Sequence, residues 1–213
     1  MILEEIDKLA KISKLDFQND RNNEKHVRVK NSRNVYVLSL YYKSQITNLE
    51  QFIKIEINFV EDIQTKYKIQ DIHTILDYYP LDSSFLETIN YKIEKPKLWV
   101  YSIDEIILEK IRAIMTRYEF KPRDVFDLFL INKYHKNIFK TSYKSVKNKL
   151  DSSAFEHDTR GNVKNFLELD LDYDISDIKN LSLITYNNDD FHSFEKELLK
   201  FLKNIAGEYL SSY

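Results

Sequence analysis

The stretch Tyr101–Ile131 reads YSIDEIILEKIRAIMTRYEFKPRDVFDLFLI and contains two helical segments with charges at core positions. Ser102, followed three residues later by Glu105, forms a capping-box pattern that predicts a helix start. From there, isoleucines recur at helical spacing on one face, namely Ile103, Ile106, Ile107, Ile111 and Ile114. At about 100° per residue, Lys110 falls near the centre of that apolar face and Arg117 falls beside it. These two cations are therefore candidates for a function or for a buried ion pair.

A second helix is predicted from Pro122 onward, since proline is favoured in the first turn of a helix. This helix is apolar nearly all round, which predicts burial, and Asp124 and Asp127 share one edge of it because they are three residues apart. A buried carboxylate is unfavourable unless a cation, a metal or a hydrogen-bond donor pairs with it. Two interpretations stay open, an ion-pair latch between the two helices and a functional site.

The same residues resemble the second half of a known family pattern. Glu109-Lys110-Ile111-x-Ala113, then Arg117, then Arg123-Asp124-x-x-Asp127-Leu128 are similar to the AbiEii/AbiGii toxin family of nucleotidyltransferases. The resemblance implies a polymerase-β-like nucleotidyltransferase fold, a Mg²⁺-bound nucleoside triphosphate (NTP), and a toxin of a toxin–antitoxin or abortive-infection system. It also implies residue roles. Lys110 would contact the triphosphate, Asp124 would be a catalytic aspartate, and Arg117 and Asp127 would support the nucleotide site.

An upstream strand supplies a third candidate carboxylate. In Phe52–Phe59 the apolar residues alternate with Lys54, Glu56 and Asn58, which predicts a strand with one polar face. In the nucleotidyltransferase fold an acidic residue on a central strand completes a carboxylate set around the metal, and Glu56 matches that position. Mg²⁺ prefers oxygen ligands, so we expect Glu56 to be a catalytic and metal-binding residue. The alternative is that these polar residues form only the solvent face of an antiparallel strand.

The family pattern fails near the N-terminus. The family begins with a Gly-Gly or Gly-Ser turn, which brings backbone to the phosphates, and an Asp-x-Asp pair, which holds the metals. This chain has two glycines, Gly161 and Gly207, both near the C-terminus. Residues 2–12 predict an amphipathic helix, interpreted as the helix after the Asp-x-Asp strand, with inward residues Ile2, Ile6, Leu9 and Ile12. The segment Ser13–Phe17 has the sequence SKLDF and is similar to the segment of the family that contains the Asp-x-Asp pair, with Lys14 in place of the first aspartate. We interpret this similarity as accidental. We therefore expect the first catalytic motif to be missing from a truncated nucleotidyltransferase core.

Two functions follow from that expectation. The chain is a nucleotidyltransferase-like toxin that transfers a nucleotide from an NTP to an RNA or protein acceptor, and without the first motif it is inactive or nearly so alone. The alternative is a non-catalytic interaction protein derived from the same fold, whose partner is an antitoxin or another chain. The final predicted helix, residues 191–210, has an apolar stripe that packs internally or receives such an antitoxin.

Charge along the chain is uneven. Arg21–Arg33 and Lys140–Lys149 are basic segments, and a solvated surface is the favoured interpretation of both. The alternative is that they contact the phosphates of an RNA acceptor. The helix predicted to begin after Ser102 also has a polar face, with Glu105, Glu109 and Arg112, which is expected to face solvent.

Composition sets the remaining limits. The chain has 213 residues, a net charge of −2 and no cysteine, which excludes disulfide scaffolds and zinc fingers. It has no apolar run of about 18 residues, so no membrane span is predicted and a cytoplasmic location is expected. The expected fold class is α+β, with a mixed or antiparallel sheet and packed helices. The expected domains are a nucleotidyltransferase-like core over residues 1–135 and a helical C-terminal region over residues 136–213.

Overall fold

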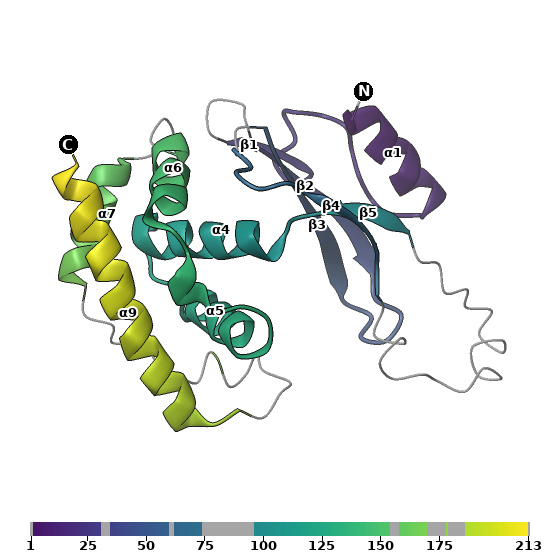
Figure 1. Ribbon diagram of the computed structural model, residues 1–213. Coiled ribbons are helices and arrows are strands. Elements are labelled where there is room, and N and C mark those ends of the chain that lie inside the picture. Colours follow the sequence, from purple (N-terminus) through teal and green to yellow (C-terminus); the bar gives the residue numbers. More distant parts are fainter. Residues whose placement is uncertain are drawn as a thin grey trace. The chain divides into compact units, whose positions relative to one another are not determined.

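The computed structural model describes residues 2–30, 35–59, 62–73, 96–153, 158–169, 178 and 186–212. The chain divides into two compact units, Met1–Asp62 and Ile63–Tyr213, which are described separately below. Helices and antiparallel sheets occur together (Figure 1), which confirms the predicted α+β class.

The first unit is built on a three-stranded antiparallel sheet. Its strands β1 (Val27–Lys30), β2 (Val35–Lys43) and β3 (Glu50–Asn58) lie in the order β1-β2-β3. The central place of β2 was predictable, because its sequence is apolar on both faces and a central strand loses solvent on both sides. In the register, Leu38 lies opposite both Val27 and Ile55, so these three side chains share one face of the sheet.

Helix α1 (Ile2–Ile12) packs in the core of this unit, and the helix itself was predicted correctly. The prediction of its inward face was right for Ile6 and wrong for Leu9 and Ile12. Leu3, Ile6 and Ala10 contact the sheet residues, whereas Leu9 is 60% exposed and Ile12 is 78% exposed. The apolar stripe of α1 is broad, and the sheet covers only the edge around Ala10, whose small side chain allows close approach. Periodicity defined the stripe without showing which part of it the sheet covers.

The second unit begins with a short ribbon formed by β4 (Lys68–Asp71) and β5 (Lys97–Val100), which pair antiparallel. Strand β5 leads directly into α4 (Ile103–Thr116), the helix that the capping-box pattern predicted. The N-cap of α4 is Ser102, whose Oγ accepts a hydrogen bond from the Glu105 amide at 3.2 Å. This is one of the two hydrogen bonds of a capping box, and it confirms the predicted helix start.

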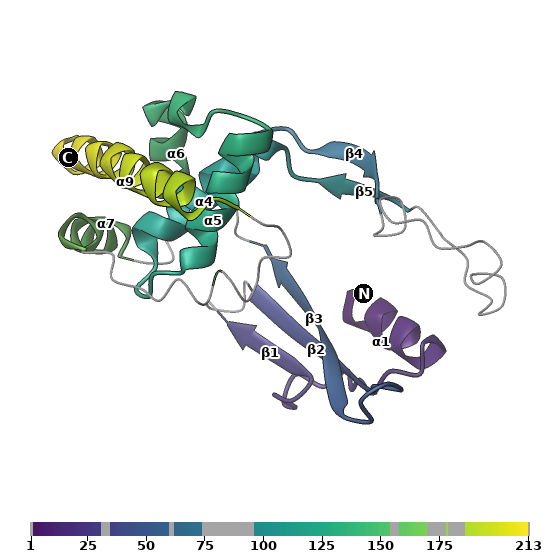
Figure 2. The same cartoon turned by 90° about the horizontal axis from the view of Figure 1, so that it is seen from below.

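Helix α4 is the centre of the second unit. It contacts α5 (Pro122–Tyr134), α6 (Tyr143–Ser153), α7 (Thr159–Glu168) and α9 (Asn188–Ser211), and a short 3₁₀ helix η2 (Ile138–Lys140) follows α5. Figure 2 shows these helices gathered around α4. All five α-helices share one hydrophobic core. The boundary predicted at residues 135/136 falls within this packed group, and its meaning as a domain boundary stays a prediction.

Helix α9 buries the apolar stripe that the sequence predicted. Its buried residues are Phe191, Phe194, Leu198, Leu202, Ile205, Ala206 and Tyr209. Because other helices of this chain cover these side chains, the stripe is not the surface that receives an antitoxin. In the described part of the chain, no helix combines the length and the apolar composition that crossing a bilayer requires.

Candidate functional site

Four charged side chains from α4 and α5 meet where the two helices are joined. Lys110 Nζ lies 2.8 Å from Asp124 Oδ1 and 2.5 Å from Asp127 Oδ2. Arg117 Nη1 donates to Asp124 Oδ2, so the two oxygens of Asp124 receive different cations. The structure therefore brings together Lys110, Arg117, Asp124 and Asp127, here called the charged cluster.

Local structure explains why these residues meet. Helix α4 ends at Thr116, and Arg117 follows as an extended C-cap residue whose side chain turns toward α5. Helix α5 starts with Pro122, which places Asp124 in its first turn, where the helix dipole favours a negative charge. Asp127 lies one turn later on the same edge, within reach of Lys110.

Burial differs sharply between the members of the charged cluster. The Asp124 side chain is only 2% exposed, whereas Lys110 is 26% exposed and Arg117 is 40% exposed. Burial of the Lys110 ammonium lowers its pKa, but the hydrogen bonds and negative charges of Asp124 and Asp127 outweigh this, so the pKa of Lys110 is raised above 10.5. Lys110 is therefore a fixed positive charge at physiological pH.

The arrangement can act as an anion site. Asp124 is the buried anchor, and the two cations it holds reach partly into solvent. Lysine has three N–H donors and arginine has five. Within the described residues Lys110 uses two of these donors and Arg117 uses one, so donors remain for a phosphate oxygen. The same contacts would also form if the four charges only held α4 and α5 together. The geometry is therefore consistent with an anion site and with an ion-pair latch.

Glu56 lies on β3 in the first unit, as the sequence predicted, and its side chain is exposed. Its carboxylate pairs with Lys54, 2.6 Å away on the same face of the strand. Glu56 thus belongs to a different unit from the charged cluster, and its participation in a common site stays a prediction. The solvent-face alternative matches its surroundings within the first unit.

Asp16 of the first unit lies in the segment Ser13–Phe17, whose similarity to the family motif is interpreted as accidental. It forms an antiparallel bridge with Tyr41 of β2, directly after α1. Its oxygens lie 3.6 Å from Lys25 Nζ and 3.9 Å from His26 Nε2. By the strand register Asp16 and Glu56 share a face of the sheet, since Tyr41 and Val37, their partners on β2, are four residues apart.

The described residues do not fit a magnesium site. Among them, no three His, Cys, Asp or Glu side chains are grouped so as to hold a metal. Lys110 and Arg117 take both oxygens of Asp124, and Lys54 takes the carboxylate of Glu56. The contacts that the described residues show in the charged cluster are ion pairs of Lys110 and Arg117 with the two aspartates.

A second buried network, between α4 and α6, was missed from the sequence. Lys149 Nζ lies 2.7 Å from Glu105 Oε1 and 2.5 Å from Glu109 Oε1, and both Lys149 and Glu105 are almost fully buried. Glu105 Oε2 also accepts from the backbone amide of Thr65 at 2.8 Å and from its hydroxyl at 3.0 Å.

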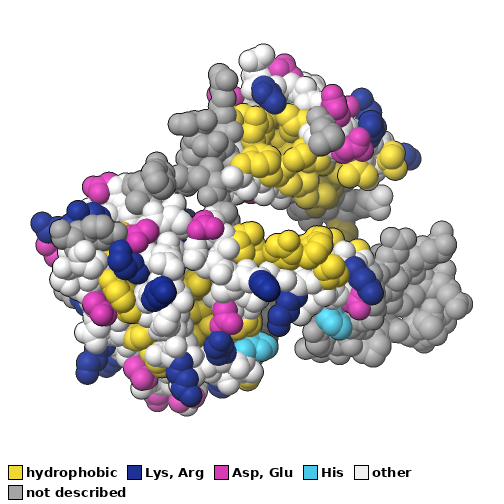
Figure 3. All heavy atoms as spheres, turned by 45° about the horizontal axis from the view of Figure 1, so that its top comes forward, with side chains coloured by type: hydrophobic (Ala, Val, Ile, Leu, Met, Phe, Trp, Pro, Cys, Tyr) yellow, Lys and Arg dark blue, Asp and Glu magenta, His cyan; other side chains and the backbone are white. Residues whose placement is uncertain are grey.

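Two expectations are corrected by this network. The face of α4 with Glu105 and Glu109 packs on α6 instead of facing solvent, and Lys149 is removed from the basic surface of Lys140–Lys149. On the helical unit at the left of Figure 3, Lys and Arg side chains are interspersed with Asp and Glu side chains. This view gives no support for an extended basic surface among the described residues.

The fold and the site define a class of α+β proteins that contain antiparallel sheets and a pair of helices joined by a cluster of charged side chains. The sequence matches the family described as nucleotidyl transferase AbiEii toxin, type IV toxin–antitoxin system, over residues 2–206. The chain belongs to this family, which confirms the resemblance.

Other comparisons add little to the family match. A crystal structure of a candidate nucleotidyltransferase from H. pylori is similar at 13% sequence identity with a TM-score of 0.37. The similarity covers 87% of this chain, and the chain spans only 65% of the length of that protein. No curated protein matches the sequence.

Proposed function

We propose that this chain is the nucleotide-binding part of a nucleotidyltransferase toxin, in which Lys110 and Arg117 contact the phosphates of an NTP. The supporting observation is the arrangement of the charged cluster, where a buried Asp124 holds two partly exposed cations. Asp127 orients Lys110 from the other side. Family membership supports the same chemistry, because nucleotidyl transfer uses an NTP and generally a divalent cation.

The proposed reaction transfers a nucleotide to an RNA or protein acceptor in the cytoplasm, and an antitoxin protein is the proposed regulator. In nucleotidyl transfer the acceptor oxygen attacks the α-phosphorus, and the bond to the bridging oxygen of the leaving pyrophosphate breaks. Lys110 and Arg117 would offset the negative charge that develops on the phosphates. Asp124 acts through these cations, so it is a positioning residue in this proposal.

The transfer assay uses the purified chain with Mg²⁺, an NTP labelled at the α-phosphate, and total RNA or protein as acceptor. The proposal predicts that any label transferred to an acceptor by the wild type is lost with Lys110→Ala. Absence of transfer by the wild type would agree with the expectation that this chain is inactive alone. The matched control is Lys144→Ala, an exposed lysine of α6. Equal labelling by wild type and Lys110→Ala would contradict the proposed role of Lys110.

A second candidate function is a non-catalytic interaction protein in which the charged cluster is only a latch. It is favoured by the pairing of both Asp124 oxygens with cations. Replacing a buried ion pair with apolar side chains of similar size is often neutral or stabilising. A pure latch therefore predicts that Lys110→Met with Asp124→Leu keeps the wild-type free energy of unfolding and leaves NTP affinity unchanged. A nucleotide site predicts that this double variant folds but loses NTP affinity.

A further inference from the structure

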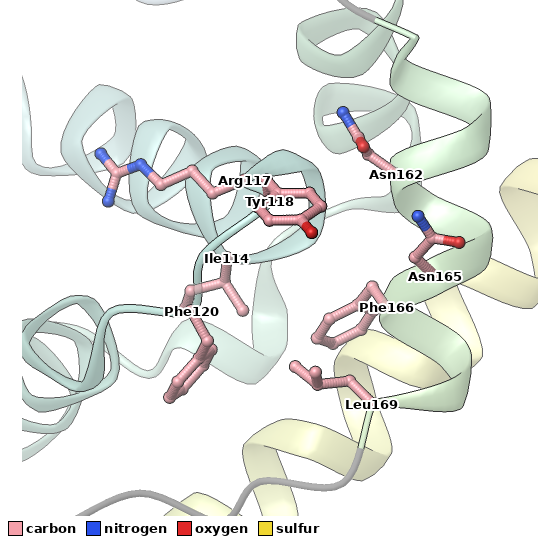
Figure 4. A pocket seen from close by; sticks show the side chains of 8 residues that line it. All are labelled: Ile114, Arg117, Tyr118, Phe120, Asn162, Asn165, Phe166 and Leu169. Atoms are coloured by element: carbon pink, nitrogen blue, oxygen red, sulfur yellow. The ribbon is translucent and has the colours of Figure 1, made fainter.

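A pocket in the second unit lies directly beside the charged cluster. It opens between the turn that follows α4 and one face of α7, and Arg117 lines it together with aromatic and amide side chains (Figure 4). The aromatic residues are Tyr118, Phe120 and Phe166, and the amides are Asn162 and Asn165. All of these belong to the same compact unit as the charged cluster.

Some of the residues that line the pocket are buried in the helical core, and others are exposed to solvent. Phe166 is buried and Phe120 is half-buried, so their rings are held by the helical core. Tyr118 is fully exposed, so its ring is accessible to a ligand. Asn162 is half-buried and Asn165 is exposed.

Arg117 connects this pocket with the charged cluster. Its backbone and stem line the pocket, while its guanidinium extends away from the aromatic rings (Figure 4) and bonds to Asp124. A ligand that places phosphates on Lys110 and Arg117 therefore has an aromatic pocket on the other side of the same residue. This continuity distinguishes the pocket from an isolated packing defect.

We infer that the pocket receives the base of the NTP whose phosphates contact Lys110 and Arg117. The inference rests on the proposed function, since it needs the triphosphate at the charged cluster. A nucleobase has a flat π-face and an edge of alternating hydrogen-bond donors and acceptors. Tyr118 and Phe120 offer rings for stacking on the face. Asn162 and Asn165 each offer an N–H₂ donor and a carbonyl acceptor to the edge.

Calorimetric titration distinguishes the contribution of the base to binding affinity from that of the phosphates. The full chain is titrated with Mg²⁺ and inorganic tripolyphosphate, with each of the four common NTPs, and with a short single-stranded RNA. The test variants are Tyr118→Ala and Asn162→Ala. Their matched controls are Tyr134→Ala, another exposed tyrosine, and Asn148→Ala, an exposed asparagine of α6.

At least one NTP is expected to bind about tenfold or more tightly than tripolyphosphate, because stacking on one aromatic side chain contributes about that much. Each test variant should weaken that NTP about five- to tenfold and leave tripolyphosphate affinity unchanged, whereas the controls change neither.

Three results would overturn the inference. If NTPs and tripolyphosphate bind with equal affinity, and Tyr118→Ala and Asn162→Ala change neither affinity, the pocket does not bind the base. The proposed phosphate site would not be affected by that result. Sensitivity of RNA binding alone to the variants would show that the pocket takes a base from RNA and not from the NTP. Binding of neither tripolyphosphate nor NTP would reject both the pocket and the proposed function for this chain.

Discussion

Asp124 determines how the charged cluster behaves, because it is the one fully buried member. A buried carboxylate without partners would be strongly destabilising, and here Lys110 and Arg117 each satisfy one of its oxygens. Since the carboxylate is fixed, the two cations are fixed as well, at the surface of the helix pair. A structural requirement in the core thus holds two positive charges in place, which are the charges that the proposed function uses to contact phosphates.

The pairing of Lys110 with Asp124 could be predicted from sequence, because both residues are charged positions on predicted helices joined by a short turn. The network of Glu105 and Lys149 could not. These residues are 44 positions apart, and each falls in a local pattern with an ordinary explanation, a capping box and a run of surface lysines. Only the packing of α6 on α4 brings them together.

Lys149→Met should destabilise the second unit strongly. The substitution removes the cation from Glu105, which stays buried as an uncompensated charge, and breaking such a pair costs about 3 to 5 kcal/mol. Lys144→Met in the same helix should change the free energy of unfolding by less than about 0.5 kcal/mol, because Lys144 is exposed. Urea denaturation measures both variants. Similar losses for the two lysines would show that the buried network contributes little.

The stability contributed by Lys149 should also depend on alkaline pH. Burial lowers the pKa of Lys149, but hydrogen bonds and charges from Glu105 and Glu109 outweigh it and raise the pKa above 10.5. Because the folded-state pKa is the higher one, the contribution is fully present below pH 10.5 and is lost as pH rises through the raised value. The difference in unfolding free energy between wild type and Lys149→Met should therefore shrink above that pH. A difference that grows with pH would contradict this sign.

At the scale of single elements, the sequence was most informative where periodicity and burial agree. The helices α4, α5 and α9 and the strand β3 follow their predicted patterns. Each of these helices presents one clear apolar face or is apolar nearly all round, and β3 alternates apolar with polar residues. Helix α1 departs from its prediction in orientation, because its apolar stripe is wider than the surface that covers it. Short β1 was not predicted, as its alternation of valine with basic residues lies within a segment interpreted by its charge.

Two isoleucines of α1 give a matched test of its orientation. Ile6 packs on the sheet and Ile12 is mostly exposed. Ile6→Ala should destabilise the first unit by about 1 to 2 kcal/mol, because it removes partly buried methyl groups, and Ile12→Ala should change stability by less than about 0.5 kcal/mol. Thermal and urea unfolding of the two variants provide the comparison. A larger loss for Ile12→Ala than for Ile6→Ala would contradict the packing of α1 on the sheet through Ile6.

At the scale of the whole molecule, the candidate residues are divided between two units. The charged cluster and its neighbouring pocket lie in the second unit, and Glu56 and Asp16 lie in the first. Sequence patterns predicted the helix pair that holds the charged cluster and the strand that holds Glu56, because each of these elements depends on neighbouring residues. Patterns could not establish whether Glu56 joins the cluster, because that depends on how two separately packed units meet. The account therefore assigns phosphate binding to the second unit by itself.

Calorimetric titration of the purified chain with Mg²⁺–NTP tests that assignment most directly, with Lys110→Ala as the test variant and Lys144→Ala as the matched control. The account predicts saturable binding to wild type and control. It also predicts at least about a tenfold loss of affinity in Lys110→Ala, because a hydrogen bond to a charged group contributes about 1.5 to 3 kcal/mol. Binding with equal affinity to all three proteins, or to none of them, would contradict the account and leave the charged cluster as a latch between α4 and α5.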